Sequence, residues 1–278
     1  MDDINVKGLG TPMIFTFSVN IKFLRNFFAV LLSLFLFSSC TENNKRSDVY
    51  IKTEDDLASF ANSLRSGEFV DDNGEPVYKV IHLVDDIEIT KPFVQIGDME
   101  HPFFGYFDGA EHTIKNLSLK SDTSTSVAMF GYVINSHIQN FKLENVDMKG
   151  DSDVAGICGY AYGTLFMNCE VSGKVEGINC VGGLVGEVSY CTVDNCTFEG
   201  SVSGTGYSVG GVAGSFEYGA VIRCNSSGSV SGDVDVSGLV GSVAECLLIE
   251  SESQVDVKYN RLTVTDFDKI SKLLFSSL

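Results

Sequence analysis

The carboxylates are the side chains in this sequence with the greatest potential for chemistry. Within residues 127–257 they recur at similar places, where they could serve as general acids and bases or as Ca²⁺ ligands. Basic groups that would neutralise an acidic substrate are few in this stretch. A solvated acidic surface is the simplest interpretation, a binding surface the next and an active site the last. The recurring acids are Asp151, Asp153, Glu176, Asp233 and Asp235, and the bases are Lys142, Lys149, Lys174 and Arg223.

Aromatic side chains suggest a binding edge. Five of six such residues lie near one recurring turn, so they could line up and contact a glycan or a protein. The six are Tyr160, Tyr162, Tyr190, Tyr207, Phe216 and Tyr218.

One serine has the spacing of a nucleophile. Gly206–Gly210 reads GYSVG and matches G-x-S-x-G, which requires a strand, a sharp turn, a helix and a later histidine. The last histidine, His137, lies upstream, and a repeat rather than a helix follows. We therefore predict no catalytic role for Ser208 and no other catalytic residue.

Cysteine and asparagine recur in the same pattern. Beyond Cys40 there are seven cysteines without a C-x-x-C pair, so we expect buried reduced thiols and neither a bound metal nor a cofactor, with a disulfide as the alternative. We expect the asparagines to form hydrogen bonds between stacked amides. The cysteine column is Cys169, Cys196 and Cys224, and the asparagine column is Asn140, Asn168 and Asn195, preceded by Asn116.

A repeat of 27 or 28 residues must position these groups. Small and apolar residues keep fixed offsets from one anchor glycine, whereas a weaker earlier turn aligns Ile114 with Ile138 and Asn116 with Asn140. The anchors are Gly131, Gly159, Gly186, Gly214 and Gly241, and two residues before them stand Met129, Ile157, Leu184, Val212 and Leu239.

Short strands interrupted by glycine bury an apolar face only by stacking. We therefore predict an all-β fold, a parallel β-solenoid with coils of about 27 residues and short helical caps at both ends. A capping unit at 50–104 begins with a helix whose N-cap is Thr53. The solenoid is expected at 105–259 and a C-terminal capping helix at 260–278.

Within the repeats, Gly183–Gly186 and Gly238–Gly241 both read GLVG. These segments resemble the GLUG motif of secreted Bacteroidota proteins, and 106–117 is similar to the segment that precedes such repeats. The resemblance covers about 50–257. It implies an association with surface adhesins and with a bacterial immunoglobulin A peptidase, in which the repeats are accessory to a catalytic domain. The motif contains no catalytic residues.

The beginning of the chain has the features of an export signal. Lys22 and Arg25 precede an apolar run at 27–37 that is too short to span a bilayer. The residues ending in Cys40 resemble the lipobox of bacterial lipoproteins, with Phe37 where an aliphatic residue is usual. We therefore expect a signal peptide at 1–39, a lipidated tether at 40–49 and attachment to a membrane through Cys40.

The net charge of the chain argues against one class of partner. Lys+Arg 19 against Asp+Glu 37 gives a net charge of −18, which argues against nucleic acid as a partner. We expect a non-enzymatic lipoprotein of the cell envelope, held at the outer membrane, with an acidic surface for adhesion or for a glycan or protein partner. Two alternatives stay open: a carbohydrate-active β-helix enzyme, and a structural lipoprotein facing the periplasm. The leaflet, surface exposure and oligomeric state also stay open.

Overall fold

The computed structural model describes residues 48–259 except 72–73, 75 and 122–124. The predicted signal peptide, Cys40, nearly all of the tether and the predicted C-terminal helix lie outside these residues. In the part of the chain that is described, no helix has the length and apolar character needed to cross a membrane.

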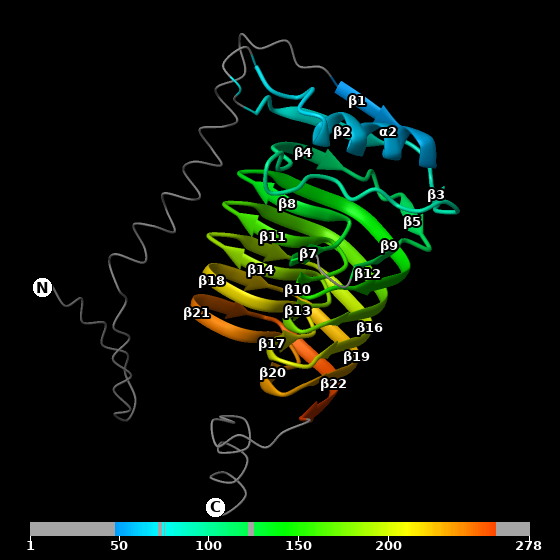
Figure 1. The fold of residues 1–278 in the computed structure, drawn as a ribbon. Coiled ribbons are helices and arrows are strands. Elements are labelled where there is room, and N and C mark those ends of the chain that lie inside the picture. Colours follow the sequence, from blue (N-terminus) through cyan, green and yellow to red (C-terminus); the bar gives the residue numbers. More distant parts are fainter. Residues whose placement is uncertain (1–47, 72–73, 75, 122–124, 260–278) are drawn as a thin grey trace, which may run out of the picture. The chain divides into compact units, whose positions relative to one another are not determined.

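The fold is a parallel β-solenoid with about 27 residues per coil, as predicted, and it has about seven turns (Figure 1). Successive coils pair in register. Phe166 pairs with Val193, which pairs with Val221, and that residue pairs with Leu248. Each of these partners lies seven residues after its anchor glycine, so the sequence spacing corresponds to the spacing of the coils.

Most strands belong to a 17-stranded sheet that forms two sides of the stack. The bounds are β1 (Asp48–Ile51), β2 (Lys79–Leu83), β3 (Ile87–Glu88), β4 (Gly105–Asp108), β5 (Thr113–Lys115), β6 (Ser118–Lys120), β8 (Phe130–Ile134), β9 (His137–Lys149), β11 (Cys158–Tyr162), β12 (Leu165–Gly177), β14 (Val185–Ser189), β15 (Thr192–Asp194), β16 (Thr197–Gly204), β18 (Ala213–Ile222), β19 (Asn225–Gly232), β21 (Val240–Ile249) and β22 (Glu252–Tyr259). On one of these sides, β9, β12, β16, β19 and β22 pair in turn, one strand from each coil.

A five-stranded sheet forms the third side, just before the anchor glycine of each coil. Its middle strands place Asp153, Cys180 and Ser208 above one another, all with a left-handed backbone (φ 51°, 48° and 60°). The bounds are β7 (Thr125–Val127), β10 (Ser152–Val154), β13 (Asn179–Gly182), β17 (Tyr207–Gly210) and β20 (Val234–Ser237).

Three of the anchor glycines, Gly186, Gly214 and Gly241, lie against these left-handed corners. A Cβ atom on Gly214 would lie 2.5 Å from the main-chain nitrogen of Val181, and one on Gly241 would lie 2.6 Å from the carbonyl carbon of Ser208. Each corner belongs to the coil before the glycine. The repeat therefore needs glycine because the main chains of neighbouring coils meet there without room for a side chain.

The interior is filled by the predicted apolar columns. Leu184 and Val212 are fully buried, as are Met129 and Ile157, whereas Leu239 near the last coil is only partly buried. The cysteines of the predicted column are buried free thiols, and the main-chain N–H of Cys169 donates to Cys196 Sγ over 3.4 Å. These thiols act as small apolar groups, since burial raises the pKa of Cys196 well above its usual range.

The asparagine column forms the expected ladder. Asn195 Nδ2 donates to Asn168 Oδ1 over 2.8 Å, and Asn168 Nδ2 donates to Asn140 Oδ1 over 2.9 Å. All three residues have a positive φ between 51° and 56°. Asparagine suits this position for two reasons. It tolerates the left-handed backbone, and its side-chain amide both donates and accepts hydrogen bonds.

The alignment predicted for the weak early turn is wrong. Ile114 pairs with Leu143 rather than with Ile138, and Asn116 accepts from Asn145 Nδ2 over 2.7 Å rather than from Asn140. The partner of Ile138 is Phe107. One long strand, β9, thus pairs with three short strands, β4, β5 and β6, whose connections change the spacing.

The N-terminal helix is present as α2 (Glu54–Arg65) with Thr53 as its N-cap, and Thr53 and Asp56 form a capping box. Leu57, Phe60, Ala61 and Leu64 are buried on its inner side. The segment predicted as a capping unit, 50–104, also contributes strands to the stack. Its strands β2 and β3 pair in parallel with β4 and β5, so the stack of strands begins before residue 105.

We predict that Gly214→Ala destabilises the fold by about 2 kcal/mol or more, because its methyl group would overlap the main chain of β13. Urea unfolding of the chain from residue 41 onward measures the effect. The matched control is Ser215→Ala, which removes an outward hydroxyl one residue away. Equal stabilities of the two variants would contradict the role assigned to the glycine.

We predict that Asn168→Ala lowers the free energy of unfolding by about 1–2 kcal/mol, because two hydrogen bonds are lost and alanine is strained at φ 53°. Asn168→Gly loses the same bonds without the strain, so its loss should be smaller. If Asn168→Gly were as stable as the parent chain, the ladder would contribute nothing to stability.

Candidate functional site

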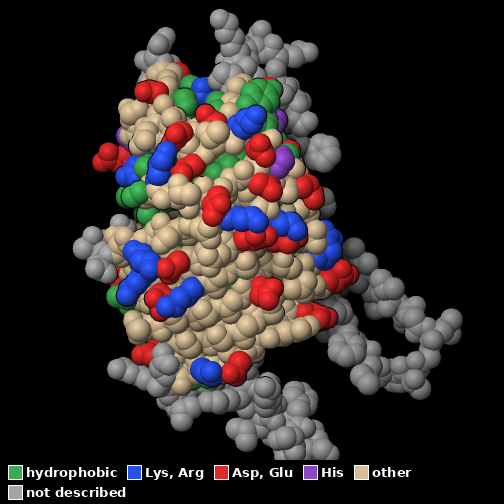
Figure 2. All heavy atoms as spheres, turned by 90° about the vertical axis from the view of Figure 1, so that its right-hand side faces the viewer, with side chains coloured by type: hydrophobic (Ala, Val, Ile, Leu, Met, Phe, Trp, Pro, Cys, Tyr) green, Lys and Arg blue, Asp and Glu red, His purple; other side chains and the backbone are tan. Residues whose placement is uncertain are grey.

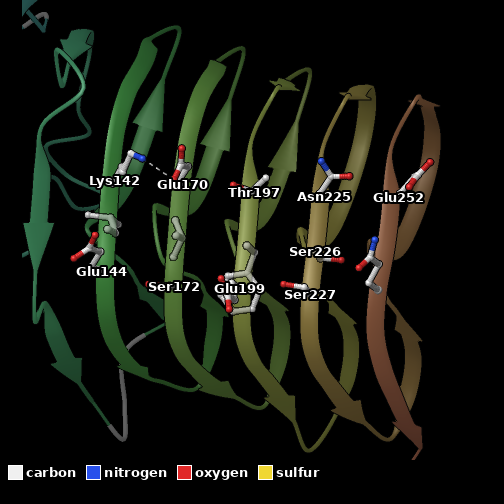
Figure 3. A pocket seen from close by; sticks show the side chains of 14 residues that line it. Lys142, Glu144, Glu170, Ser172, Thr197, Glu199, Asn225, Ser226, Ser227 and Glu252 are labelled. Carbon is white, nitrogen blue, oxygen red and sulfur yellow. Dashed lines mark ion pairs between the residues drawn. The ribbon is translucent and has the colours of Figure 1, made fainter.

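A groove crosses five strands on one side of the solenoid. It has a volume of about 500 Å³ and lies over β9, β12, β16, β19 and β22 (Figure 3). Figure 2 views the side of the stack that carries these strands. There, charged side chains of both signs stand among backbone and uncharged polar groups, with few hydrophobic side chains. The groove is therefore suited to a polar ligand.

Two outward columns of polar side chains line the groove. Strand register places their members one coil apart, so hydroxyl, amide and carboxylate groups recur along the solenoid axis at about 4.8 Å. Between the columns, Val171 and Phe198 point into the core. The first column is Lys142, Glu170, Thr197, Asn225 and Glu252, and the second is Ser172, Glu199, Ser227 and Gln254, with Glu144 beside it where the register of β9 shifts.

A glycine column borders the groove and shapes it. Gly173, Gly200 and Gly228 pair with one another and have φ angles of 138°, 152° and 107°. The register of β9 against β12 also shifts here, at Val171 and Gly173. A backbone of this kind bends the strand locally. A Cβ atom on any of these glycines would overlap the main chain of the preceding coil, so glycine is needed for the close pairing of the coils here.

The negative charge of the groove is only partly neutralised. Lys142 forms an ion pair with Glu170 over 3.0 Å, which raises the pKa of Lys142, and Lys115 pairs with Glu144 over 3.1 Å. Glu199 and Glu252 are exposed and form no ion pair within the described ranges. The groove can therefore attract cationic groups or accept hydrogen bonds from hydroxyls, and it repels anions.

The predicted aromatic edge separates into several parts. Tyr162, Tyr190 and Tyr218 follow one another in contact: the ring of Tyr162 is tilted by 55° to that of Tyr190 at 5.3 Å, and Tyr190 stacks on Tyr218 at 4.9 Å. Tyr160 contacts Tyr132 instead, at 5.5 Å. Because the rings of Tyr190 and Tyr218 lie 15° from parallel, they cover each other's faces and present mainly edges and hydroxyls to a ligand.

The other two aromatic residues lie elsewhere. Phe216 is fully buried in the core, and Tyr207, 52% exposed, lies on β17 in the smaller sheet. Phe216 therefore cannot belong to a binding edge. Its position in β18 pairs with Val188, and this pairing marks a core column.

Ser208 does not have the setting of a nucleophile elbow. It lies within β17, between the parallel strands β13 and β20, and is 4% exposed. No helix follows it in the described chain before residue 260. The G-x-S-x-G match is therefore part of the repeat.

Sequence reasoning missed the two columns of the groove. Neither column repeats one residue type, because an exposed position selects weakly for side-chain identity. A signal existed nonetheless. Counting 27 or 28 residues onward from Glu170 gives Thr197, Asn225 and Glu252 in turn.

The comparisons with known proteins agree with the fold. The GLUG motif matches residues 177–203, which include the anchor Gly186. Halomucin of Haloquadratum walsbyi (strain DSM 16790 / HBSQ001) is 36% identical over 97 residues, which is 34% of this chain but only 1% of Halomucin.

A solved structure from Bacteroides ovatus, described as "a putative immunoglobulin A1 protease", has a TM-score of 0.60 with 20% identity. The alignment covers 74% of this chain and 67% of that one. At this identity the likeness shows the fold alone. The comparisons thus identify a chain with a GLUG motif that folds as a parallel β-solenoid.

Proposed function

We propose that this protein is a non-enzymatic lipoprotein of the cell envelope whose solenoid binds an extended polar ligand in adhesion. The observation that carries the proposal is the groove over β9, β12, β16, β19 and β22. A ligand lying along the solenoid axis would meet a polar group at the corresponding position of each coil, so many weak contacts would add along its length.

The charge of the groove favours one class of ligand. The carboxylates of Glu199 and Glu252 would repel sulfated or uronic glycans, whereas they can accept hydrogen bonds from the hydroxyls or ammonium groups of neutral and amino-sugar polymers. We propose a neutral or amine-bearing glycan, with a basic protein segment as the second choice.

The proposed location rests on the leader. The basic residues Lys22 and Arg25, the apolar run at 27–37 and the lipobox-like end at Cys40 support export and lipid attachment at the outer membrane. Surface display would place the groove in contact with glycans outside the cell.

We predict that the chain from residue 41 onward binds neutral or amino-sugar polysaccharides in a glycan array and does not bind heparin or hyaluronan. Glu199→Gln combined with Glu252→Gln should weaken binding about tenfold, the value of one or two charge-assisted hydrogen bonds. Glu217→Gln is the matched control, since Glu217 is equally exposed but lies on β18 outside the groove. Preferred binding of polyanions, or equal loss in both variants, would contradict the proposal.

A carbohydrate-active enzyme is the second candidate, because the same groove carries carboxylates that could act as acid and base. Incubation of the bound polysaccharide with the chain and Ca²⁺ distinguishes the two functions. Adhesion predicts an unchanged polymer. New reducing ends or unsaturated sugars that disappear in the double variant would establish the enzyme instead.

A further inference from the structure

Cys180 differs from every other cysteine in the described part of the chain. Its thiol points at a carboxylate, with Sγ 3.5 Å from Glu187 Oε2, and has no main-chain acceptor there. Each of the other six thiols donates to a main-chain carbonyl oxygen. These pairs are Cys158 with Tyr160, Cys169 with Met167, Cys191 with Ser189, Cys196 with Asp194, Cys224 with Ile222 and Cys246 with Leu247.

Three strands bring metal-binding atoms together around this thiol. Asp153 on β10 is the coil-to-coil neighbour of Cys180 on β13, and Glu187 lies on β14 directly after the anchor Gly186. One ligand atom from each of the three side chains lies within 4.8 Å of the other two. Gly186 has no side chain to separate β14 from the corner at Asp153, so the anchor glycine allows this approach.

The cluster combines a buried donor with an accessible opening. Cys180 is 5% exposed and forms the base of the cluster. Asp153 and Glu187 are only half-buried, so an ion can reach the thiol from solvent past the two carboxylates.

No cation compensates this cluster. Asp153 and Glu187 form no ion pair with a Lys, Arg or His anywhere in the described ranges. Burial and the charge of Glu187 raise the pKa of Asp153 to about 7, and burial, with the charges of both carboxylates, raises the pKa of Cys180 to about 12. Such mutual repulsion is relieved when a cation binds between the groups.

We propose that Asp153, Cys180 and Glu187 form a binding site for a divalent transition metal, best matched by Zn²⁺. One thiolate with two carboxylates is a borderline-soft donor set of the kind that zinc accepts. A tetrahedral ion with bonds of about 2.3 Å to sulfur and 2.0 Å to oxygen separates the two atoms by about 3.5 Å. That is the distance between Cys180 Sγ and Glu187 Oε2.

Binding would link two consecutive coils. Cys180 releases its thiol proton to solvent, as does any protonated fraction of Asp153, and the ion takes the place of those protons. Three protein ligands leave the fourth tetrahedral position for a water molecule. Because Asp153 belongs to the coil before Cys180 and Glu187, the bound metal would stabilise the folded stack.

Titration of the metal-free full chain in detergent with Co²⁺, and then with Zn²⁺, tests the site. We expect one Co²⁺ per chain, a thiolate-to-cobalt charge-transfer band and loss of that band when Zn²⁺ is added. Cys180→Ser should abolish the band, and Glu187→Gln should weaken Co²⁺ binding at least tenfold. Cys246→Ser, which removes a thiol bonded to a carbonyl, should leave both unchanged.

Thermal unfolding gives a second readout. Zn²⁺ should raise the Tm of the parent chain and of Cys246→Ser but not of Cys180→Ser. Absence of a thiolate band in the parent chain, or its persistence in Cys180→Ser, would overturn the proposal. If Cys180→Ser does not fold, Glu187→Gln is the deciding variant, because Glu187 is only half-buried and its substitution should be tolerated. Unchanged Co²⁺ affinity in that variant would also overturn the proposal.

Discussion

The close main-chain contact at the anchor glycine is the constraint on which the rest of this structure depends. A left-handed corner of one coil lies directly against the glycine of the next coil, so no Cβ fits between them. Any change in the length of a coil would move its corner away from this glycine. From Gly159 to Gly241 the period of 27 or 28 residues therefore keeps each corner against the next glycine, and the columns of these coils follow from it.

In some columns the side chains use their polar groups or ring faces on one another, and in others these groups remain available to a ligand. The Asn140–Asn168–Asn195 ladder and the contacting rings of Tyr162, Tyr190 and Tyr218 use their polar groups or ring faces on each other. The groove columns are less self-contained, since Lys142–Glu170 is the one ion pair between column members in the described chain. We therefore expect a ligand to bind where residue types vary most from coil to coil. This favours the groove, rather than the tyrosine edge, as the binding surface.

Much of the fold could be predicted from the sequence, because buried columns restrict residue type. Gly186 and Gly214 lie at contacts between coils, and Leu184 and Val212 lie in the core. Because these positions accept few residue types, their spacing in the sequence predicts the coil length. The first turns were misaligned because β9 pairs with three short strands, which moved Ile114 to Leu143. The spacing of the repeat does not predict the lengths of the connections between those strands.

The candidate sites were harder to predict for two physical reasons. Outward residues such as Thr197 and Asn225 share no chemistry that would mark a column, although their spacing is regular. The second reason is contact between different columns. Cys180 and Glu187 belong to different columns, so reading each column separately could not reveal that their side chains meet. Phe216 illustrates the converse error, since an aromatic residue near the turn was assigned to the surface but fills the core.

The central proposal is that this solenoid is displayed on the cell surface, where it binds a ligand. Proteinase treatment of intact cells that carry the protein tests it most directly, with an antibody against residues 127–257 as readout and a periplasmic protein as the control for leakage. The account predicts that the antibody signal is lost while the periplasmic control stays intact. A signal that is protected in intact cells and disappears only after lysis would place the solenoid in the periplasm and contradict the account.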